Sequence, residues 1–298
     1  MKKHSIGKSD VVVSEISFGC MSLTGEPEPH VSLLHKAFDG GITFFDTADL
    51  YEHGENEKLL GRAFSGMRQQ VVIATKVGNQ WRPDGSGWDW NPTKAYILTA
   101  VEESLKRLKT DYIDLYQLHG GTLEDPIDET IEAFELLKQQ GKIREYGISS
   151  IRPGVIREWI RRSNIVSVMM QYSLLDRRPE ESCLASLHQN QISVLARGSL
   201  AKGLLVNKPA TAYLNYTADD VREAAKAVAL VSDETRTETA TAIQFALYPP
   251  VVASAVVGIR TDKQLADAIR SSKSQPLSQS EWEQLTTALS PNFYDQHR

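Results

Sequence analysis

The chain has 298 residues, of which 41% are hydrophobic and 24% are charged, and its formal net charge is −5. This composition is typical of a globular protein with a sizeable core, and it argues against a disordered chain. The negative net charge argues against nucleic acid and anionic membranes as partners. The two cysteines, Cys20 and Cys183, lie far apart and lack metal-ligand spacing. We expect a cytoplasmic protein, either a monomer or a small homo-oligomer, with no disulfide, no metal site and no membrane span.

Short runs rich in β-branched and aromatic residues alternate with longer amphipathic segments along the whole chain. This alternation is typical of βαβ units with parallel strands. The candidate strands number eight and cover Ile16–Phe18, Thr43–Asp46, Val71–Lys76, Tyr112–Leu118, Ile143–Ser149, Val166–Gln171, Ser193–Arg197 and Ala253–Val257.

The segments between these strands have helical periodicity, and glycines or prolines lie near several of their ends. The candidate helices are Val31–Asp39, Glu57–Phe64, Lys94–Lys106, Pro126–Gln140, Pro153–Arg162, Arg178–Gln189, an interrupted Asp219–Ala246, and Thr261–Ile269. We also expect a small hairpin from His4–Ile6 and Val11–Val13, and an added C-terminal helix over Ser278–Leu289.

Two architectures have this order of elements, a closed (α/β)8 TIM barrel and an open doubly wound sheet. The open sheet normally carries a GxGxxG fingerprint after its first strand, whereas this chain has FGCMSLTG there. Eight units without the fingerprint favour the barrel, with residues 1–298 as a single domain.

Barrel enzymes place their functional residues at the carboxyl ends of the strands. The residues that end the second to sixth candidate strands, and Tyr51 just after Asp46, are therefore expected at one mouth of the barrel. They are Asp46, Lys76, His119, Ser149 and Gln171. Each residue type also occurs in purely structural roles, but an acid, a cation, a phenol and an imidazole at one mouth favour a catalytic site.

This set of groups favours proton transfer to an oxygen. An ammonium at Lys76 would stabilise the phenolate of Tyr51 and lower the pKa of the phenol, and Asp46 is the natural counter-ion of Lys76. His119 would donate a hydrogen bond to the substrate oxygen. Because these groups provide no electrons, a hydride donor is also needed, and a nicotinamide is the usual one.

Several sequence blocks together resemble the aldo-keto reductase family. They are DTADLY followed by Glu57, VVIATK, DLYQLH, YGISS and MMQYSLLDRR, and they occur in the family's order over essentially the whole chain. The stretches TDYIDLYQLHGG and GISSIRP are similar to those of a bacterial branch of uncharacterised oxidoreductases. The resemblance implies a tetrad of Asp46, Tyr51, Lys76 and His119, with Tyr51 as the general acid in carbonyl reduction.

The resemblance also implies which residues bind NADPH. Ser149, Ser150 and Gln171 would bind the carboxamide of the nicotinamide. The stretch Gly198–Leu204 would surround the pyrophosphate and Gly258–Asp267 the adenosine end. The implied cofactor residues are Ser149, Ser150, Gln171, Arg197, Gly198, Ser199, Leu200, Lys202, Gly203, Gly258, Arg260, Gln264 and Asp267.

The chain departs from the family pattern at three of these positions. Ser150 stands where many members have asparagine, Gly258 stands where the family has a lysine for the 2′-phosphate, and Arg197 replaces an aromatic residue that stacks on the nicotinamide. A guanidinium can stack on a ring, and its charge would disfavour the oxidised cofactor. Arg260, helped by Lys263, would then bind the 2′-phosphate, which favours NADPH over NADH, although Arg260 also suits an exposed helix start.

The loop GNQWRPDGSGWDWNPTK after the third strand carries Trp81, Trp88 and Trp90. We expect at least one indole to line an apolar substrate pocket, and His53 to lie beside it, although packing of the loop explains the tryptophans equally well. Two other functions are compatible with the residues at the barrel mouth. One is a cofactor-sensing regulatory subunit with little turnover, and the other is a barrel lyase or isomerase. The sequence leaves the natural substrate and the physiological direction open.

Overall fold

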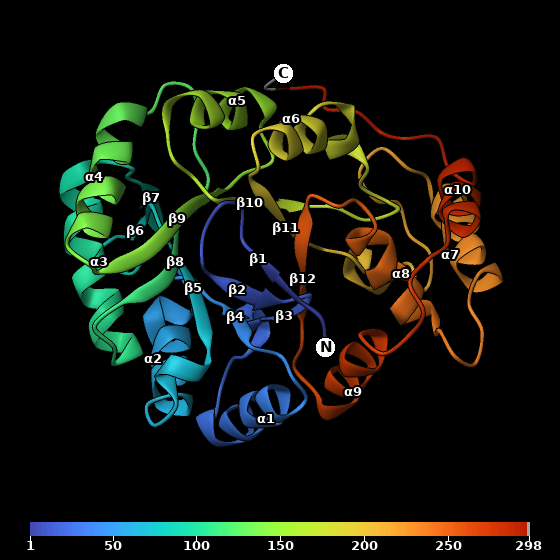
Figure 1. Cartoon of the computed structure of the whole chain (residues 1–298), viewed down its shortest axis with the longest axis horizontal. Coiled ribbons are helices and arrows are strands. Elements are labelled where there is room, and N and C mark those ends of the chain that lie inside the picture. The colour runs from blue at the N-terminus through green and yellow to red at the C-terminus, as the bar shows by residue number, and fades with distance from the viewer. Residues whose placement is uncertain (297–298) are drawn as a thin grey trace.

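The computed structural model describes residues 1–296 and contains a closed barrel of eight parallel strands with helices around it (Figure 1). The strands follow one another around the barrel in chain order, and the last pairs with the first. This confirms the predicted (α/β)8 barrel, and each strand lies within one residue of its predicted bounds. The barrel strands are β3 (Ile16–Gly19), β4 (Phe44–Asp46), β5 (Val72–Val77), β8 (Ile113–Leu118), β9 (Ile143–Ser149), β10 (Ser167–Gln171), β11 (Ser193–Arg197) and β12 (Val252–Gly258).

The helices form an outer ring around the strands, as Figure 1 shows. They are α1 (Pro27–Asp39), α2 (Glu55–Ala63), α3 (Lys94–Leu108), α4 (Ile127–Gln139), α5 (Pro153–Arg162), α6 (Cys183–Gln189), α7 (Ala218–Leu230), α8 (Glu238–Leu247), α9 (Asp262–Ser271) and the added C-terminal helix α10 (Gln279–Thr287). Among residues 1–296, no helix has the length and apolar character that a membrane crossing requires.

Two helical predictions need correction. Helix α1 begins at Pro27, four residues before the predicted Val31, because a proline in the first turn has the required φ and lacks only an N–H that has no partner there. The predicted helix Arg178–Gln189 is a 3-10 turn followed by α6, because Ser182 between them has a non-helical φ of −157°.

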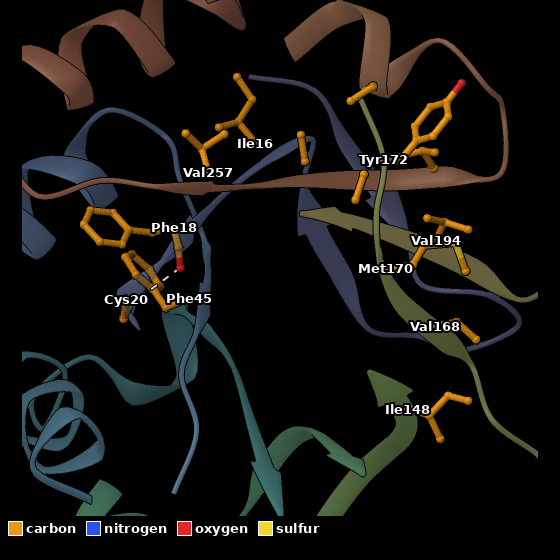
Figure 2. Close-up of a cluster of buried hydrophobic side chains, with 14 of the residues drawn as sticks. Ile16, Phe18, Cys20, Phe45, Ile148, Val168, Met170, Tyr172, Val194 and Val257 are labelled. Atoms are coloured by element: carbon orange, nitrogen blue, oxygen red, sulfur yellow. Dashed lines mark hydrogen bonds between the residues drawn. The ribbon is translucent and has the colours of Figure 1, made fainter. Parts of the chain in front are cut away.

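The core has an outer and an inner part. Outward-facing side chains of the strands pack against the helices, and Figure 2 shows part of this layer, in which Phe18 and Phe45 stack with ring centroids 6.0 Å apart. The inner part includes Phe44, Ala74 and Leu115 on three neighbouring strands. Successive side chains of a strand point to opposite faces, which explains why Phe44 and Phe45 belong to different parts.

A hairpin of β1 (Lys3–Ser5) and β2 (Val12–Ser14) packs against the inner core through Ile6, Val11 and Val13. It was predicted at nearly these positions. At its turn, Gly7 has φ +56°, and a Cβ there would lie only 2.5 Å from the carbonyl oxygen of Val166, which precedes β10. The hairpin therefore covers the end of the barrel where the strands begin, and leaves the other mouth for the candidate site.

Candidate active site

The period of two along each strand places polar side chains directly above the inner core. Asp46 follows Phe44 by two residues, and Lys76 follows Ala74 by two. The same spacing relates Gln171 to Met169 and Arg197 to Leu195. These four polar side chains therefore share the inward face of the barrel at the carboxyl ends of the strands, where the sequence predicted the site.

Lys76 and Asp46 form a buried ion pair between neighbouring strands. The Nζ of Lys76 lies 2.8 and 2.7 Å from the two carboxylate oxygens of Asp46, and it also donates to the carbonyl oxygen of Thr47 at 2.6 Å. The side chains are 1% and 6% exposed. Burial lowers the pKa of Lys76, but Asp46 and Tyr51 outweigh it and raise this pKa above its usual value. The ammonium is therefore retained despite its burial.

Tyr51 lies on a strained turn between β4 and α2, with its ring close to this ion pair. The Nζ of Lys76 is 5.1 Å from the centroid of the Tyr51 ring. The next three residues, Glu52, His53 and Gly54, all have left-handed backbone conformations, with φ of 49°, 54° and 85°. Such a run persists only where the surrounding structure fixes it.

The sequence predicted a lowered pKa for Tyr51, and the structure shows the opposite net direction. Burial raises the pKa of Tyr51 above its usual value, Lys76 lowers it, and Asp46 raises it further, so that the net direction is upward. The ammonium acts in the predicted sense, but desolvation of the phenolate is the larger effect. Tyr51 is therefore protonated at neutral pH.

His119 follows β8 and completes the group of four. Its ring is edge-on to Tyr51, with centroids 5.9 Å apart and an interplanar angle of 82°. Burial, together with the charges of Lys76 and Arg197, lowers the pKa of His119 to about 3. The imidazole is therefore neutral at physiological pH, and its buried Nδ1 has no hydrogen-bond partner within residues 1–296.

The predicted nicotinamide residues lie on the other half of the same mouth. Gln171 is in register with Arg197 on the neighbouring strand, and a Cβ on Gly198 would lie 3.7 Å from Cγ of Gln171. Gly198 itself has φ +76°. The side chain of Ser150 already accepts a hydrogen bond from the backbone N–H of Arg152 at 3.2 Å. Of the remaining predicted residues on this half, Ser149, Leu200 and Gly203 are half-buried, Ser199 is buried and Lys202 is exposed.

The residues predicted for the adenosine end surround the start of α9. Gly258 ends β12 with open space where a Cβ would stand, and Arg260 is exposed. The side chain of Gln264 accepts from the backbone N–H of Arg260 at 3.0 Å, while Asp267 lies half-buried one turn further along the helix.

The tryptophan loop forms an antiparallel hairpin that the sequence analysis missed, with strands β6 (Asn79–Trp81) and β7 (Trp88–Trp90). Trp81 stacks on His53 with centroids 3.6 Å apart, and both line a hollow of about 320 Å³ together with Tyr51 and Trp88. Trp90 instead donates from Nε1 to Asp125 at 2.9 Å and packs against the core. Trp81 and Trp88 thus line the hollow beside Tyr51, and Trp90 anchors the loop.

Several buried polar groups around the site were not predicted from the sequence. Asp49 is buried, and Gln117 has no hydrogen-bond partner for its amide within the described chain. Glu57, noted only as part of a motif, pairs with Arg107. A glutamate in the first turn of α2, the helix that follows the Tyr51 turn, was the available signal, but its partner is 50 residues away in the sequence.

The chain thus has the fold and the site of a barrel enzyme, with a lysine, an aspartate, a tyrosine and a histidine at the mouth of eight strands. Comparison with known proteins gives the family. The family model for the aldo/keto reductase family matches residues 15–290. The uncharacterised oxidoreductase YqkF of Bacillus subtilis is 48% identical, with complete coverage of both chains. The aldo-keto reductase YhdN of the same organism is 35% identical over 74% of this chain and 69% of its own length.

Solved structures agree with these matches. The holo form of aldo-keto reductase AKR11C1 from Bacillus halodurans has a TM-score of 0.94 and 47% identity, covering 100% of this chain and 99% of that one. The apo form has a TM-score of 0.86. A glycerol dehydrogenase of Gluconobacter oxydans, 24% identical over 98% of this chain and 97% of that one with a TM-score of 0.86, shares the fold.

This chain belongs to the aldo-keto reductase family. It is therefore an oxidoreductase of a family that uses nicotinamide cofactors.

Proposed function

We propose that this protein reduces a small aldehyde or ketone to an alcohol by hydride transfer from NADPH, with Tyr51 as the general acid. The observation that carries the proposal is the contact of Tyr51 with both Lys76 and His119 at the barrel mouth, beside a hollow lined by aromatic side chains. A proton donor and a hydrogen-bond donor can then reach one carbonyl oxygen.

Burial raises the pKa of Tyr51, so the phenol holds its proton at neutral pH, and Lys76 opposes this rise. Once the proton has moved to the carbonyl oxygen, the ammonium of Lys76 stabilises the phenolate. Asp46 and Thr47 hold that ammonium in place. Neutral His119 has one ring N–H, which donates to the substrate oxygen and holds it near Tyr51.

The residues on the other half of the mouth fit a dinucleotide. Ser149, Ser150 and Gln171 offer hydrogen-bonding groups for a carboxamide, and the open space at Gly258 admits a backbone approach by a ligand. Bound NADPH supplies the hydride that goes to the carbonyl carbon. The guanidinium of Arg197, which makes no ion pair within residues 1–296, would stack on the nicotinamide, and exposed Arg260 would bind the 2′-phosphate.

The substrate would occupy the hollow beside Tyr51. His53, Trp81 and Trp88 line it, and their rings favour an apolar group attached to the carbonyl. The buried Nε1 of Trp81 lacks a partner within residues 1–296 and is available as a donor to a substrate oxygen.

The experiment is a fluorescence titration with NADPH and NADH, followed by an assay of NADPH oxidation with a panel of aldehydes and ketones. We expect Tyr51→Phe to lower kcat by about 10²- to 10⁴-fold with NADPH affinity retained, because general acid catalysis contributes a factor of that size. Arg260→Ala should weaken NADPH binding more than NADH binding.

Two outcomes would contradict the proposal. Turnover that survives in Tyr51→Phe would refute Tyr51 as the acid. NADPH binding by the wild type without turnover on any carbonyl would instead support the cofactor-sensing regulatory alternative.

A further inference from the structure

A buried cluster of polar groups lies behind the candidate site, between the barrel and helices α2 and α3. Glu57, in the first turn of α2, is fully buried and uses both carboxylate oxygens. It accepts from Thr75 Oγ1 at 2.6 Å and from Arg107 Nε of α3 at 2.6 Å. The carboxylate is thus held from two directions by groups on different elements.

Each partner of Glu57 lies next to a residue of the candidate site. Thr75 precedes Lys76 in β5, so that one side chain points outward to Glu57 while the next points inward to Asp46. Arg107 lies against Gly54, the last residue of the strained turn after Tyr51, because a Cβ built on Gly54 would be 2.6 Å from Cδ of Arg107. The ion pair therefore connects the strand of Lys76 with the turn of Tyr51.

The turn needs such support from outside. Glu52, His53 and Gly54 form a run of three left-handed residues, which costs free energy when the residues are not glycine. From the solvent side the turn is held by the stacking of His53 on Trp81. At its last residue, Gly54, the turn is held by Arg107 of α3. If one of these contacts is lost, the backbone after Tyr51 can relax toward an ordinary conformation, and the phenol of Tyr51 then moves as well.

Charge balance gives Arg107 a second effect. Asp49, also on the segment between Asp46 and Tyr51, is buried near Glu57, and its backbone N–H donates to the carbonyl oxygen of Lys76 at 3.3 Å. Burial and the charge of Glu57 both raise the pKa of Asp49, while Arg107 opposes them. Removal of Arg107 takes away the charge that opposes this rise, so Asp49 and Glu57 lose a shared counter-charge next to the Tyr51 turn.

We propose that Arg107 and Glu57 are positioning residues for the reaction: their ion pair fixes the Tyr51 turn relative to the β5 strand that carries Lys76. The inference rests on the proposed function, since it takes Tyr51 as the acid. Neither residue touches the substrate or the cofactor in this scheme, so their effect on the reaction passes through the geometry of Tyr51 and Lys76.

The test compares Arg107→Leu with Arg107→Lys, which keeps the charge, and with Lys106→Leu, the same kind of charge removal on the adjacent, exposed residue of α3. For Arg107→Leu we expect kcat to fall by about 10- to 100-fold, since misplacement of a reacting group by about 1 Å costs a factor of that order. The affinity for NADPH should be unchanged, because the cofactor residues lie on the other half of the barrel mouth. Arg107→Lys should recover part of kcat, and Lys106→Leu should match the wild type.

Amide hydrogen exchange over residues 47–58 adds a readout that does not depend on turnover. Faster exchange there in Arg107→Leu, and not in Lys106→Leu, supports a loosened turn. Wild-type kcat in Arg107→Leu, an equal loss in Lys106→Leu, or no recovery in Arg107→Lys overturns the inference.

If Arg107→Leu does not fold, Glu57→Gln decides the question from the other side of the ion pair. It removes the charge that Arg107 pairs with and keeps the size of the side chain, so kcat should fall while NADPH affinity is kept; a wild-type kcat overturns the inference. Failure of the proposed function can be distinguished from failure of this inference. If Tyr51→Phe still reduces carbonyls, that function is refuted, whereas the exchange measurement still reports whether Arg107 holds the turn.

Discussion

Replacement of Lys76 by methionine tests the electrostatics of the barrel mouth. The substitution removes an ammonium that is 1% exposed and leaves the carboxylate of Asp46, 6% exposed, without its cation. Breaking one partner of a buried ion pair costs about 3–5 kcal/mol, because the remaining charge is desolvated and unpaired. We expect the free energy of unfolding of Lys76→Met to fall by about this amount at neutral pH.

The loss should depend on pH in a defined direction. Burial raises the pKa of Asp46 and Lys76 opposes that rise, so the pKa rises further when Lys76 is removed. A group whose pKa is higher in the folded state contributes stability below its unfolded pKa, about 3.9 for aspartate, and this contribution is lost as the pH rises through the folded pKa. The destabilisation by Lys76→Met should therefore be smallest in acid and grow toward neutral pH.

Urea unfolding followed by circular dichroism at several pH values measures both effects. Lys36→Met is the matched control, because Lys36 pairs with Asp262 at 2.8 Å but the two side chains are 54% and 71% exposed. Exposed pairs contribute no more than about 1 kcal/mol. The double variant Lys76→Met with Asp46→Asn should lose less stability than the two single variants added together. Equal losses in Lys76→Met and Lys36→Met, or a loss independent of pH, would refute the reasoning.

Two further predictions concern His119 and the N-terminal hairpin. Burial and nearby positive charges lower the pKa of His119 to about 3. The rate of carbonyl reduction plotted against pH should therefore show no inflection near the usual histidine pKa of about 6.5. An inflection there that disappears in His119→Asn would contradict the neutral imidazole. Gly7→Ala should destabilise the protein by about 1–3 kcal/mol, since the new Cβ lies 2.5 Å from a backbone oxygen at a residue with φ +56°. Gly25→Ala, with φ +89° and open space around it, controls for the backbone conformation alone in the same thermal unfolding measurement, and an equal effect of both would show that the close approach does not matter.

The sequence by itself determined the barrel and the location of its candidate site. Alternation of strands and helices is a local property of the chain, and eight βα units without the GxGxxG fingerprint of an open doubly wound sheet predicted the barrel. The period of two then places Asp46 and Lys76 on the same inward face as Phe44 and Ala74, at the carboxyl ends of two successive strands.

Only the tertiary structure decided the protonation states of the site. The sequence predicted that Lys76 would lower the pKa of Tyr51, but burial outweighs this effect, because the cost of desolvating a phenolate depends on everything packed around it. The neutral state of His119 has the same origin, since part of it comes from Arg197 on the far side of the barrel.

The structure also decided which aromatic side chains line the hollow and what supports the Tyr51 turn. Trp81 and Trp90 belong to the same short hairpin, yet Trp81 stacks on His53 while Trp90 bonds Asp125. The ion pair of Glu57 with Arg107 joins residues 50 positions apart. Spacing within one element predicts the face on which a side chain lies. Contacts between elements depend on how those faces pack in the folded chain, and no local sequence pattern specifies this packing.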